Sequence, residues 1–439
     1  MKEPKVSVGI MFEPEIAFNL NTPFICNGNH YEGGGHITYF DGKILWRGEL
    51  YDHLLFEPAD KDIAFFELMD VTIGINFHWE RKENQSFKGS LKFIVEGERL
   101  TAINILGVEE YMTSVISSEM SATASLELLK AHAVISRSWL LAQIEKNREI
   151  VAAKRVYSTM VESEDELIRW YDREEHINFD ICADDHCQRY QGITRASTGI
   201  VKKAIEQTRG ELIMFDSKIC DARYSKCCGG VFEEFQNCWE DIRYPYLIAK
   251  RDTDKGVADL QADKGDSQTA HEWILSAPPA FCNTSDKKIL SQVLNNYDQE
   301  TVNFYRWQVK YTQTEISDLI KRRSGIDYGD IIDLIPVERG TSGRLIKLRI
   351  IGTKRVRIIG KELEIRRTLS ESHLYSSAFI VEKGIEKAGV PESFTLKGAG
   401  WGHGVGLCQI GAAVMGERGY KYDEILRHYF DGAVLEKRY

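Results

Sequence analysis

The sequence predicts an α+β fold, in which β-rich and helical segments form a main unit that carries a smaller inserted unit of one helix on an antiparallel sheet. Three observations predict this fold. Short β-favouring runs separated by Gly, Asn and Asp precede residue 95, two segments of helical spacing follow, and a helix with three strand patterns lies beyond residue 300. The chain has 439 residues. It is therefore long enough for more than one core, because single cores stop growing at about 250–300 residues.

The first β-rich region is predicted from runs of β-branched and aromatic residues at 6–10, 37–40 and 92–95. Asp41-Gly42 lies directly after the second run, and Asp-Gly is favoured in two-residue hairpin turns. We expect residues 1–95 to form one β-rich region, to which the sequence assigns no role.

The next stretch, residues 110–143, predicts two helices that meet at a corner near Glu119. Thr123 or Ser125 can cap the second helix, because a hydroxyl accepts a free N–H of its first turn. Lys130 and Arg137 lie seven residues apart and so share nearly one helix face. Such an arrangement suits a catalytic acid with two nearby cations, but it also suits a surface glutamate beside a solvated basic face, which the spacing alone favours.

Three further segments divide the rest of the chain. Residues 145–175 are rich in charge and predict a helical excursion or a flap, and residues 250–300 predict a linker or an inserted segment. Residues 303–360 predict a helix followed by three strands. We therefore expect a central region at 96–250, an accessory α+β unit at 251–375 and a glycine-rich completion of the main unit at 376–439.

Composition limits the class of protein. There are 56 basic and 66 acidic residues, and the net charge of −10 argues against nucleic acid as a partner. No apolar run approaches the roughly 18 residues of a membrane span. The opening MKEPKVSVGIMFEP lacks the apolar stretch of a signal peptide, so we expect either a cytosolic protein or a mature extracytoplasmic form with an added methionine.

His176, Cys182 and Cys187 form a candidate metal site. Thiolate and imidazole ligands in a short loop suit tetrahedral zinc, and three ligands leave a fourth position open. His186 is a weaker candidate than His176, because its side chain points away from that of Cys187 in an extended segment. A Cys182–Cys187 disulfide and free thiols remain as alternatives.

The chain has nine cysteines, an odd number that cannot all pair within one molecule. Four of them lie close together in the sequence: Cys220, Cys227, Cys228 and Cys238. A disulfide from Cys238 to Cys227 or Cys228 is as plausible as a second metal site. The adjacent Cys227 and Cys228 cannot pair with each other without strain.

Glycines alternate at the four positions 400, 402, 404 and 406. In an extended chain this pattern leaves one face as bare backbone, which permits close approach of another backbone or of a sugar ring. Binding and tight packing are equally compatible with it, and His403 could be a structural histidine. Gln409 opens a predicted helix that ends at Arg418, before Gly419.

Three blocks in this order resemble the stage II sporulation protein D / amidase-enhancer family of peptidoglycan-acting proteins. They are EYMTSVISSEM…LELLKAHAVISRSW, YSKCCGGVFEE…CWEDIRYPYL and GWGHGVGLCQIGAAVMGERGYKYDEILRHYF. The resemblance covers about residues 95–439 and implies a lytic transglycosylase that cleaves between N-acetylmuramic acid and N-acetylglucosamine. The chain departs from the usual pattern at three places: His132 replaces a Gln, Cys227-Cys228 replaces a small polar pair, and Cys408 replaces a Ser-like residue.

The resemblance also implies roles for individual residues. Glu119 corresponds to the essential glutamate, and Lys130 and Arg137 correspond to the basic pair, which we expect to bind substrate carboxylates or to pair with other acids. It implies zinc at His176, Cys182 and Cys187, and substrate binding by a further group: Tyr224, Ser225, His403 and Gln409.

The implied enzyme acts outside the cytoplasm on peptidoglycan glycan strands, in a groove between the Glu119 corner and residues 400–409. Two other classes remain open. The chain could be a non-catalytic glycan-binding activator of a separate cell-wall amidase, or a structural assembly protein held together by zinc and disulfides.

Overall fold

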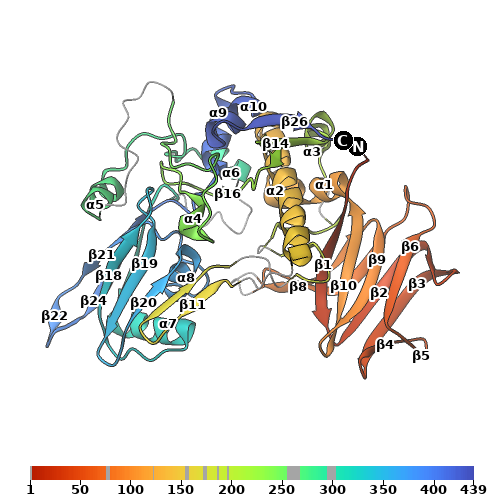
Figure 1. Ribbon diagram of the computed structural model, residues 1–439, viewed down its shortest axis with the longest axis horizontal. Helices are drawn as coiled ribbons and strands as arrows, with labels where there is room; N and C mark the ends of the chain where they lie inside the picture. The colour runs from red at the N-terminus through yellow and green to blue at the C-terminus, as the bar shows by residue number, and fades with distance from the viewer. Residues whose placement is uncertain are drawn as a thin grey trace.

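The computed structural model describes residues 2–75, 80–121, 123–153, 158–171, 176–184, 187–194, 197–254, 267–293 and 303–439. It confirms the α+β class, with two β-rich lobes on either side of a central region that contains the longest helix (Figure 1). The two termini lie close together on that central region (Figure 1). Among the described residues, no helix is both long and apolar enough to cross a membrane.

The N-terminal lobe is a strongly paired β structure whose strands follow one another mostly as antiparallel neighbours. Its strands are β1 (Lys5–Glu13), β2 (Glu15–Cys26), β3 (Asn29–Phe40), β4 (Lys43–Trp46), β5 (Glu49–Tyr51), β6 (His53–Pro58), β7 (Phe66–Ile73), β8 (Arg81–Phe87), β9 (Ser90–Glu96) and β10 (Arg99–Gly107). Asp41 and Gly42 both have positive φ between β3 and β4, as the predicted hairpin turn requires.

This lobe ends at Gly107 rather than at the expected residue 95. The reason is that β10 pairs along its length with both β9 and β1, so it belongs to the same sheet. An apolar layer lies on the inner face of the lobe, where Phe18, Phe56 and Phe93 are buried with ring centroids 5.1–6.2 Å apart.

The central region joins segments that are far apart in sequence. It contains α1 (Val108–Glu119), α2 (Leu126–Ala153), β13 (Ile181–Cys182), α3 (Gly199–Gln207), β14 (Glu211–Phe215), β15 (Lys218–Ile219), β16 (Tyr224–Ser225), α4 (Phe235–Cys238), α6 (Lys287–Val293), β25 (Leu407–Cys408), α9 (Gln409–Glu417), α10 (Tyr422–Tyr429) and β26 (Val434–Lys437). The short β16 and β25 pair in parallel, which brings the glycine-rich segment beside Tyr224.

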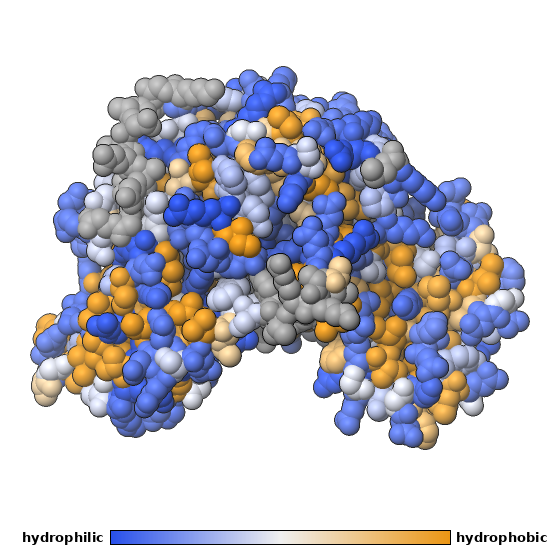
Figure 2. Space-filling view, viewed as in Figure 1, coloured by the Kyte–Doolittle hydropathy of each residue, from blue (hydrophilic) through white to orange (hydrophobic). Residues whose placement is uncertain are grey.

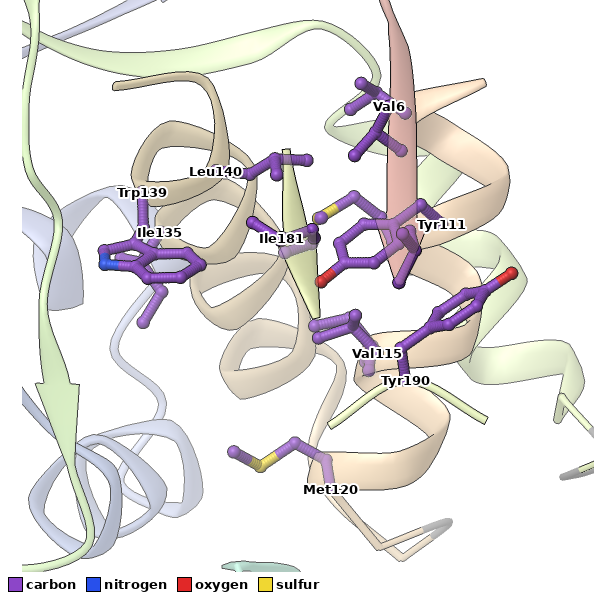
Figure 3. Packing of buried hydrophobic residues seen from close by; sticks show 14 of the residues in the cluster. Val6, Tyr111, Val115, Met120, Ile135, Trp139, Leu140, Ile181 and Tyr190 are labelled. Atoms are coloured by element: carbon purple, nitrogen blue, oxygen red, sulfur yellow. The ribbon is translucent and has the colours of Figure 1, made fainter. Parts of the chain in front are cut away.

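The core of the central region packs α1 and α2 against β1 and the segment that contains β13. Figure 3 shows Val6, Ile181 and Tyr190 gathered around Tyr111. The rings of Tyr111 and Tyr190 are stacked, with centroids 5.0 Å apart. The segment after β13 is therefore fixed against α1 by buried aromatic contacts.

The second lobe contains the predicted helix-plus-sheet unit and more. Its elements are β11 (Met160–Glu162), β12 (Glu166–Arg169), α5 (Ser267–Ser276), β17 (Arg306–Thr312), α7 (Gln313–Ser324), β18 (Ile331–Arg339), β19 (Leu345–Gly352), β20 (Val356–Gly360), α8 (Glu362–Thr368), β21 (Phe379–Lys383), β22 (Glu386–Lys387), β23 (Val390–Pro391) and β24 (Ser393–Ala399). A capping box at Thr312 and Glu315 begins α7, and Gly325 ends it in the left-handed conformation.

Two features of this lobe differ from the expectation. The charged segment at 145–175 is helical as far as Ala153, the end of α2. β11 and β12 then form a hairpin that joins β20, so a helix is wrong for this later part. β24 pairs with both β17 and β21, so the lobe extends to Ala399 and not to residue 375. Of its two partners, β17 ends about eighty residues before β24 begins, and neither segment indicates in its sequence that it pairs with the other.

Candidate functional site

Glu119 is the last residue of α1, at the corner between α1 and α2. Ser125 caps α2, as the sequence predicted, because its Oγ accepts a hydrogen bond from Leu128 N at 3.3 Å. Gln292 of α6 binds the chain between α1 and α2 by two hydrogen bonds. Its carbonyl oxygen accepts from Ser121 N at 3.0 Å, and its Oε1 accepts from Ser125 N at 3.0 Å. Sequence reasoning missed Gln292, because it lies in the segment expected to be a linker.

The carboxylate of Glu119 is half-buried and accepts a hydrogen bond from Arg189 N at 3.1 Å. The segment that supplies this amide is bound to both helices. Tyr111 Oη donates to Gln188 Oε1 at 3.3 Å, and Gln188 Nε2 donates to Ser136 O at 3.3 Å. The amide beside Glu119 is therefore held in place by α1 and α2.

The three predicted metal ligands come together in this same segment. The ligand atoms of His176, Cys182 and Cys187 all lie within 4.8 Å of one another, and all three residues are half-buried. Both cysteines are free thiols, so the alternative of a Cys182–Cys187 disulfide is wrong. His186 lies outside the described residues. Cys187 is two residues before Arg189, so an ion held here would fix the chain next to Glu119.

The two cations of α2 do not face Glu119 as a pair. Arg137 is fully buried and binds Glu109 through two hydrogen bonds, from Nε at 2.9 Å and from Nη2 at 2.7 Å. Lys130 is half-buried, donates to Glu127 at 3.2 Å and lies over the ring of Tyr422. Each cation thus pairs with an acid other than Glu119, which was one of the two possibilities that the sequence left open.

These pairings correct the assignment of Arg137 as a catalytic or substrate-binding residue. Its guanidinium also donates to Glu211 O at 3.1 Å, and a side chain with no exposed surface cannot contact a glycan strand. Glu109 in turn accepts from Gly210 N and Tyr439 Oη. The seven-residue spacing places both residues on nearly one helix face. It could not show that Arg137 is enclosed beside Glu109, whereas Lys130, nearer the start of α2, stays partly exposed beside Glu127.

A second group of polar side chains forms around His132. The ring of Tyr224 meets the imidazole edge to face, with centroids 4.7 Å apart. Gln409 Nε2 lies 3.0 Å from His132 Nε2, and Ser136 Oγ lies 3.2 Å from Nδ1. Since an amide nitrogen only donates, His132 Nε2 accepts and Nδ1 carries the proton. Ser136 thus joins this group to the segment that bears Arg189.

Ser225 lies next to this group, on β16. Its Oγ is buried and has no hydrogen-bond partner among the described residues. A buried hydroxyl normally finds a partner, because leaving it unsatisfied costs roughly 1–3 kcal/mol. The pairing of β16 with β25 thus brings Tyr224 and Ser225 beside Gln409, and their role as substrate-binding residues stays a prediction.

The burial of His132 makes the protein sensitive to acid. Burial and, to a lesser degree, the nearby Lys226 lower the pKa of its imidazole from 6.5 to about 3. Below about pH 6.5 the unfolded chain binds a proton that the folded chain does not, so the folded state loses stability as the pH falls. We expect the loss between pH 7 and pH 5 to be about 2 kcal/mol smaller in His132→Gln, since each pKa unit corresponds to about 1.4 kcal/mol. Denaturant unfolding at both pH values measures it, and an equal loss in the two proteins would contradict it.

The glycine-rich segment is not an extended strand. All four alternating glycines have positive φ, between 72° and 94°, a range that favours glycine. A Cβ on Gly404 would overlap the guanidinium of Arg344, and a Cβ on Gly406 would overlap the carbonyl of Arg223. The predicted bare strand face is therefore wrong, and tight packing accounts for these glycines.

His403 has the contacts of a structural histidine. Its Nδ1 accepts from Val405 N at 3.0 Å, and its ring meets Trp239 edge to face at 4.8 Å. Burial and the neighbouring Arg223 and Arg344 hold its pKa well below 6.5, so the imidazole is neutral. These contacts fix the turn that leads to Gln409, and they indicate a structural role for His403 rather than contact with a ligand.

Two family models match parts of the chain. Residues 96–215 match a model described as Stage II sporulation protein, and residues 233–406 match one described as a domain of unknown function. The first match contains the Glu119 corner and the three proposed ligands of the metal loop.

Several known proteins are similar over most of the chain. The amidase enhancer of Bacillus subtilis (strain 168) is 25% identical over 342 residues, 74% of this chain and 40% of that protein. An uncharacterized protein of Brachyspira hyodysenteriae is 24% identical over 80% of this chain and 72% of its own length. Stage II sporulation protein D of Bacillus amyloliquefaciens is 20% identical over 76% of each chain. The chain thus spans less than half of the amidase enhancer.

Proposed function

Because the chain belongs to the stage II sporulation protein D / amidase-enhancer family, we propose that it acts on the bacterial cell wall as a lytic transglycosylase. The observation that carries this proposal is Glu119, a half-buried carboxylate at a rigid helix corner with a fixed amide beside it. The bond to be cleaved joins N-acetylmuramic acid to N-acetylglucosamine in peptidoglycan glycan strands.

A single carboxylate is sufficient for this reaction. Ordinary glycosidases use two carboxyl groups, about 5–5.5 Å apart for retention and 6.5–9.5 Å apart for inversion. In the transglycosylase reaction the 6-hydroxyl of the muramic acid attacks its own anomeric carbon. Glu119 would first protonate the leaving oxygen and then accept the proton of that hydroxyl, so one group serves both steps.

The surroundings of Glu119 influence whether its side chain is protonated. A hydrogen bond from the Arg189 amide favours the carboxylate, whereas removal of water by a bound glycan strand favours the protonated acid. We expect the bound glycan strand to supply that removal of water. It would lie between the Glu119 corner and the half-buried Tyr224, next to which Ser225 and Gln409 are buried.

A second candidate function is activation of a separate cell-wall amidase without catalysis. The printed name of one relative, amidase enhancer, favours it. Release of soluble material from labelled, purified peptidoglycan distinguishes the two functions. A transglycosylase releases material without any other protein, whereas an activator does so only when an amidase is added.

The donor set in the loop fits zinc, and we propose that His176, Cys182 and Cys187 hold one ion. Two sulfurs and one imidazole nitrogen are ligands that zinc prefers, and they already lie within 4.8 Å of one another. The ion would hold the loop in place, and with it the Arg189 amide beside Glu119.

We also propose a location outside the cytoplasm, in the cell envelope, because the proposed substrate lies there.

Replacing Cys187 with Ser is expected to remove one equivalent of zinc per chain, because a neutral hydroxyl is a poor substitute for a thiolate. Metal content after gel filtration measures this loss. Cys26→Ser is the matched control, because Cys26 is a buried free thiol of the N-terminal lobe and is not one of the three proposed ligands. An unchanged zinc content in Cys187→Ser would contradict the assignment.

A further inference from the structure

A second group of metal-ligating side chains lies in the core of the central region, apart from the loop that contains Cys182. Ligand atoms of Cys228, Asp252, Cys282 and Cys408 all lie within 4.8 Å of one another, and all four residues are buried. No feature of the proposed reaction uses them. Their positions in the sequence span 180 residues, so only the fold brings them together.

The separations within this group match a tetrahedral ion. Cys228 Sγ lies 3.5 Å from Cys282 Sγ and 3.4 Å from Asp252 Oδ2. With zinc–sulfur bonds of about 2.3 Å and zinc–oxygen bonds of about 2.0 Å, tetrahedral ligands lie roughly 3.5–3.8 Å apart. The side chains therefore need little movement to close around an ion.

The surrounding groups orient the ligands as they do in metal sites. Asp252 Oδ1 accepts from Tyr429 Oη at 3.1 Å and lies 3.2 Å from His428 Nε2, which leaves Oδ2 directed at the sulfurs. Cys408 Sγ accepts from Cys228 N at 3.2 Å and from Gly411 N at 3.4 Å. Hydrogen bonds of this kind fix ligand geometry and favour the anionic form of a ligand.

Electrostatics around the group also favour an ion over bare thiols. A thiolate beside the Asp252 carboxylate in a buried site is costly without a cation. Arg344 and Arg306 donate to the carbonyls of Cys228 and Gly229, which offsets part of the charge that a three-thiolate site would carry.

We propose that Cys228, Cys282, Cys408 and Asp252 bind one zinc ion in a closed, structural site. Binding displaces the thiol protons of Cys228, Cys282 and Cys408 to water and leaves four ligands on the metal. The ion ties together the turn after β16, the segment at Asp252, the chain before α6 and the N-cap residue of α9. Gln409 follows Cys408 directly, so the ion also fixes the side chain that contacts His132.

Cys227, the adjacent cysteine, is not needed as a ligand. It is buried and approaches Cys282 and Cys408, but it does not belong to the group of four whose ligand atoms converge. The sequence-based alternative of a disulfide from Cys238 does not occur, since all nine cysteines lie in the described residues and are free. Cys238 instead donates to His403 O at 3.7 Å.

The test uses a chain in which this core group is intact and the loop site is removed. The double variant Cys182→Ser/Cys187→Ser is expected to retain one zinc ion per chain after gel filtration. When refolded with cobalt, it should show the absorption of a tetrahedral thiolate site. A double variant that folds and contains no metal would overturn the proposal.

Two further substitutions in the double variant locate the ion. Adding Cys282→Ser should remove the remaining zinc and lower the melting temperature, whereas adding Cys220→Ser should leave the zinc content unchanged, since Cys220 is a buried thiol outside the group. Retention of zinc after Cys282→Ser would overturn the assignment of the ligands. These results do not depend on whether the chain cleaves glycan strands.

Discussion

Glu119→Gln is expected to lower the rate of release of soluble products from purified peptidoglycan by about 10²–10⁴-fold, the usual contribution of a general acid or base. The amide keeps the size of the side chain and can still lie beside Arg189 N, but it can neither donate nor accept the proton that the reaction moves. The measurement is the initial rate of release at neutral pH, with the fold checked by circular dichroism.

Glu110→Gln is the matched control for that experiment. It is the same substitution on the same helix, at a partly exposed residue whose partner is Lys88 at 3.3 Å. We expect nearly the wild-type rate, because an exposed ion pair contributes little to stability. Equal rates for Glu119→Gln and wild type would remove Glu119 from the mechanism, and equal losses in both variants would point to damage of α1 instead.

Arg137→Met is expected to lower the free energy of unfolding by about 3–5 kcal/mol, because it leaves the Glu109 carboxylate buried without its partner. Glu109 would keep its hydrogen bonds from Gly210 N and Tyr439 Oη, but it would lose both bonds from the guanidinium. Denaturant unfolding of the purified protein measures the change.

An exposed ion pair in the same protein provides the comparison. Arg427 and Asp423 lie one turn apart on α10 with a 2.7 Å contact, and Arg427→Met should cost less than about 0.5 kcal/mol. If Arg137→Met unfolds like the wild type but releases product more slowly, the buried pair is not structural and the substrate-binding role returns.

Local patterns in the sequence predicted most of the local structure correctly. The cap at Ser125 follows from a hydroxyl before an apolar helical repeat, and the turn at Asp41 from a dipeptide that tolerates positive φ. The helix and three strands of residues 303–360 were also found, because each strand pairs with its neighbour in sequence.

Pairings between distant segments were not visible in the sequence. Nothing in the composition of β12 indicates that it joins β20, and nothing in β24 indicates β17. The core metal group shows the same limit: two of its cysteines lay outside the cluster noticed in the sequence, and Asp252 lay in the segment expected to be a linker. The alternating glycines predicted an extended strand only because their φ angles cannot be read from spacing.

The central claim, that this chain cleaves glycan strands by a single-glutamate transglycosylase reaction, is tested most directly by the chemistry of the products. Purified peptidoglycan is digested with the wild-type protein, and the new ends are identified by mass spectrometry. We predict muropeptides that end in 1,6-anhydro-N-acetylmuramic acid, formed because the 6-hydroxyl and not water attacks. Products with ordinary reducing ends would contradict this account, since they require an attacking water and a second carboxylate.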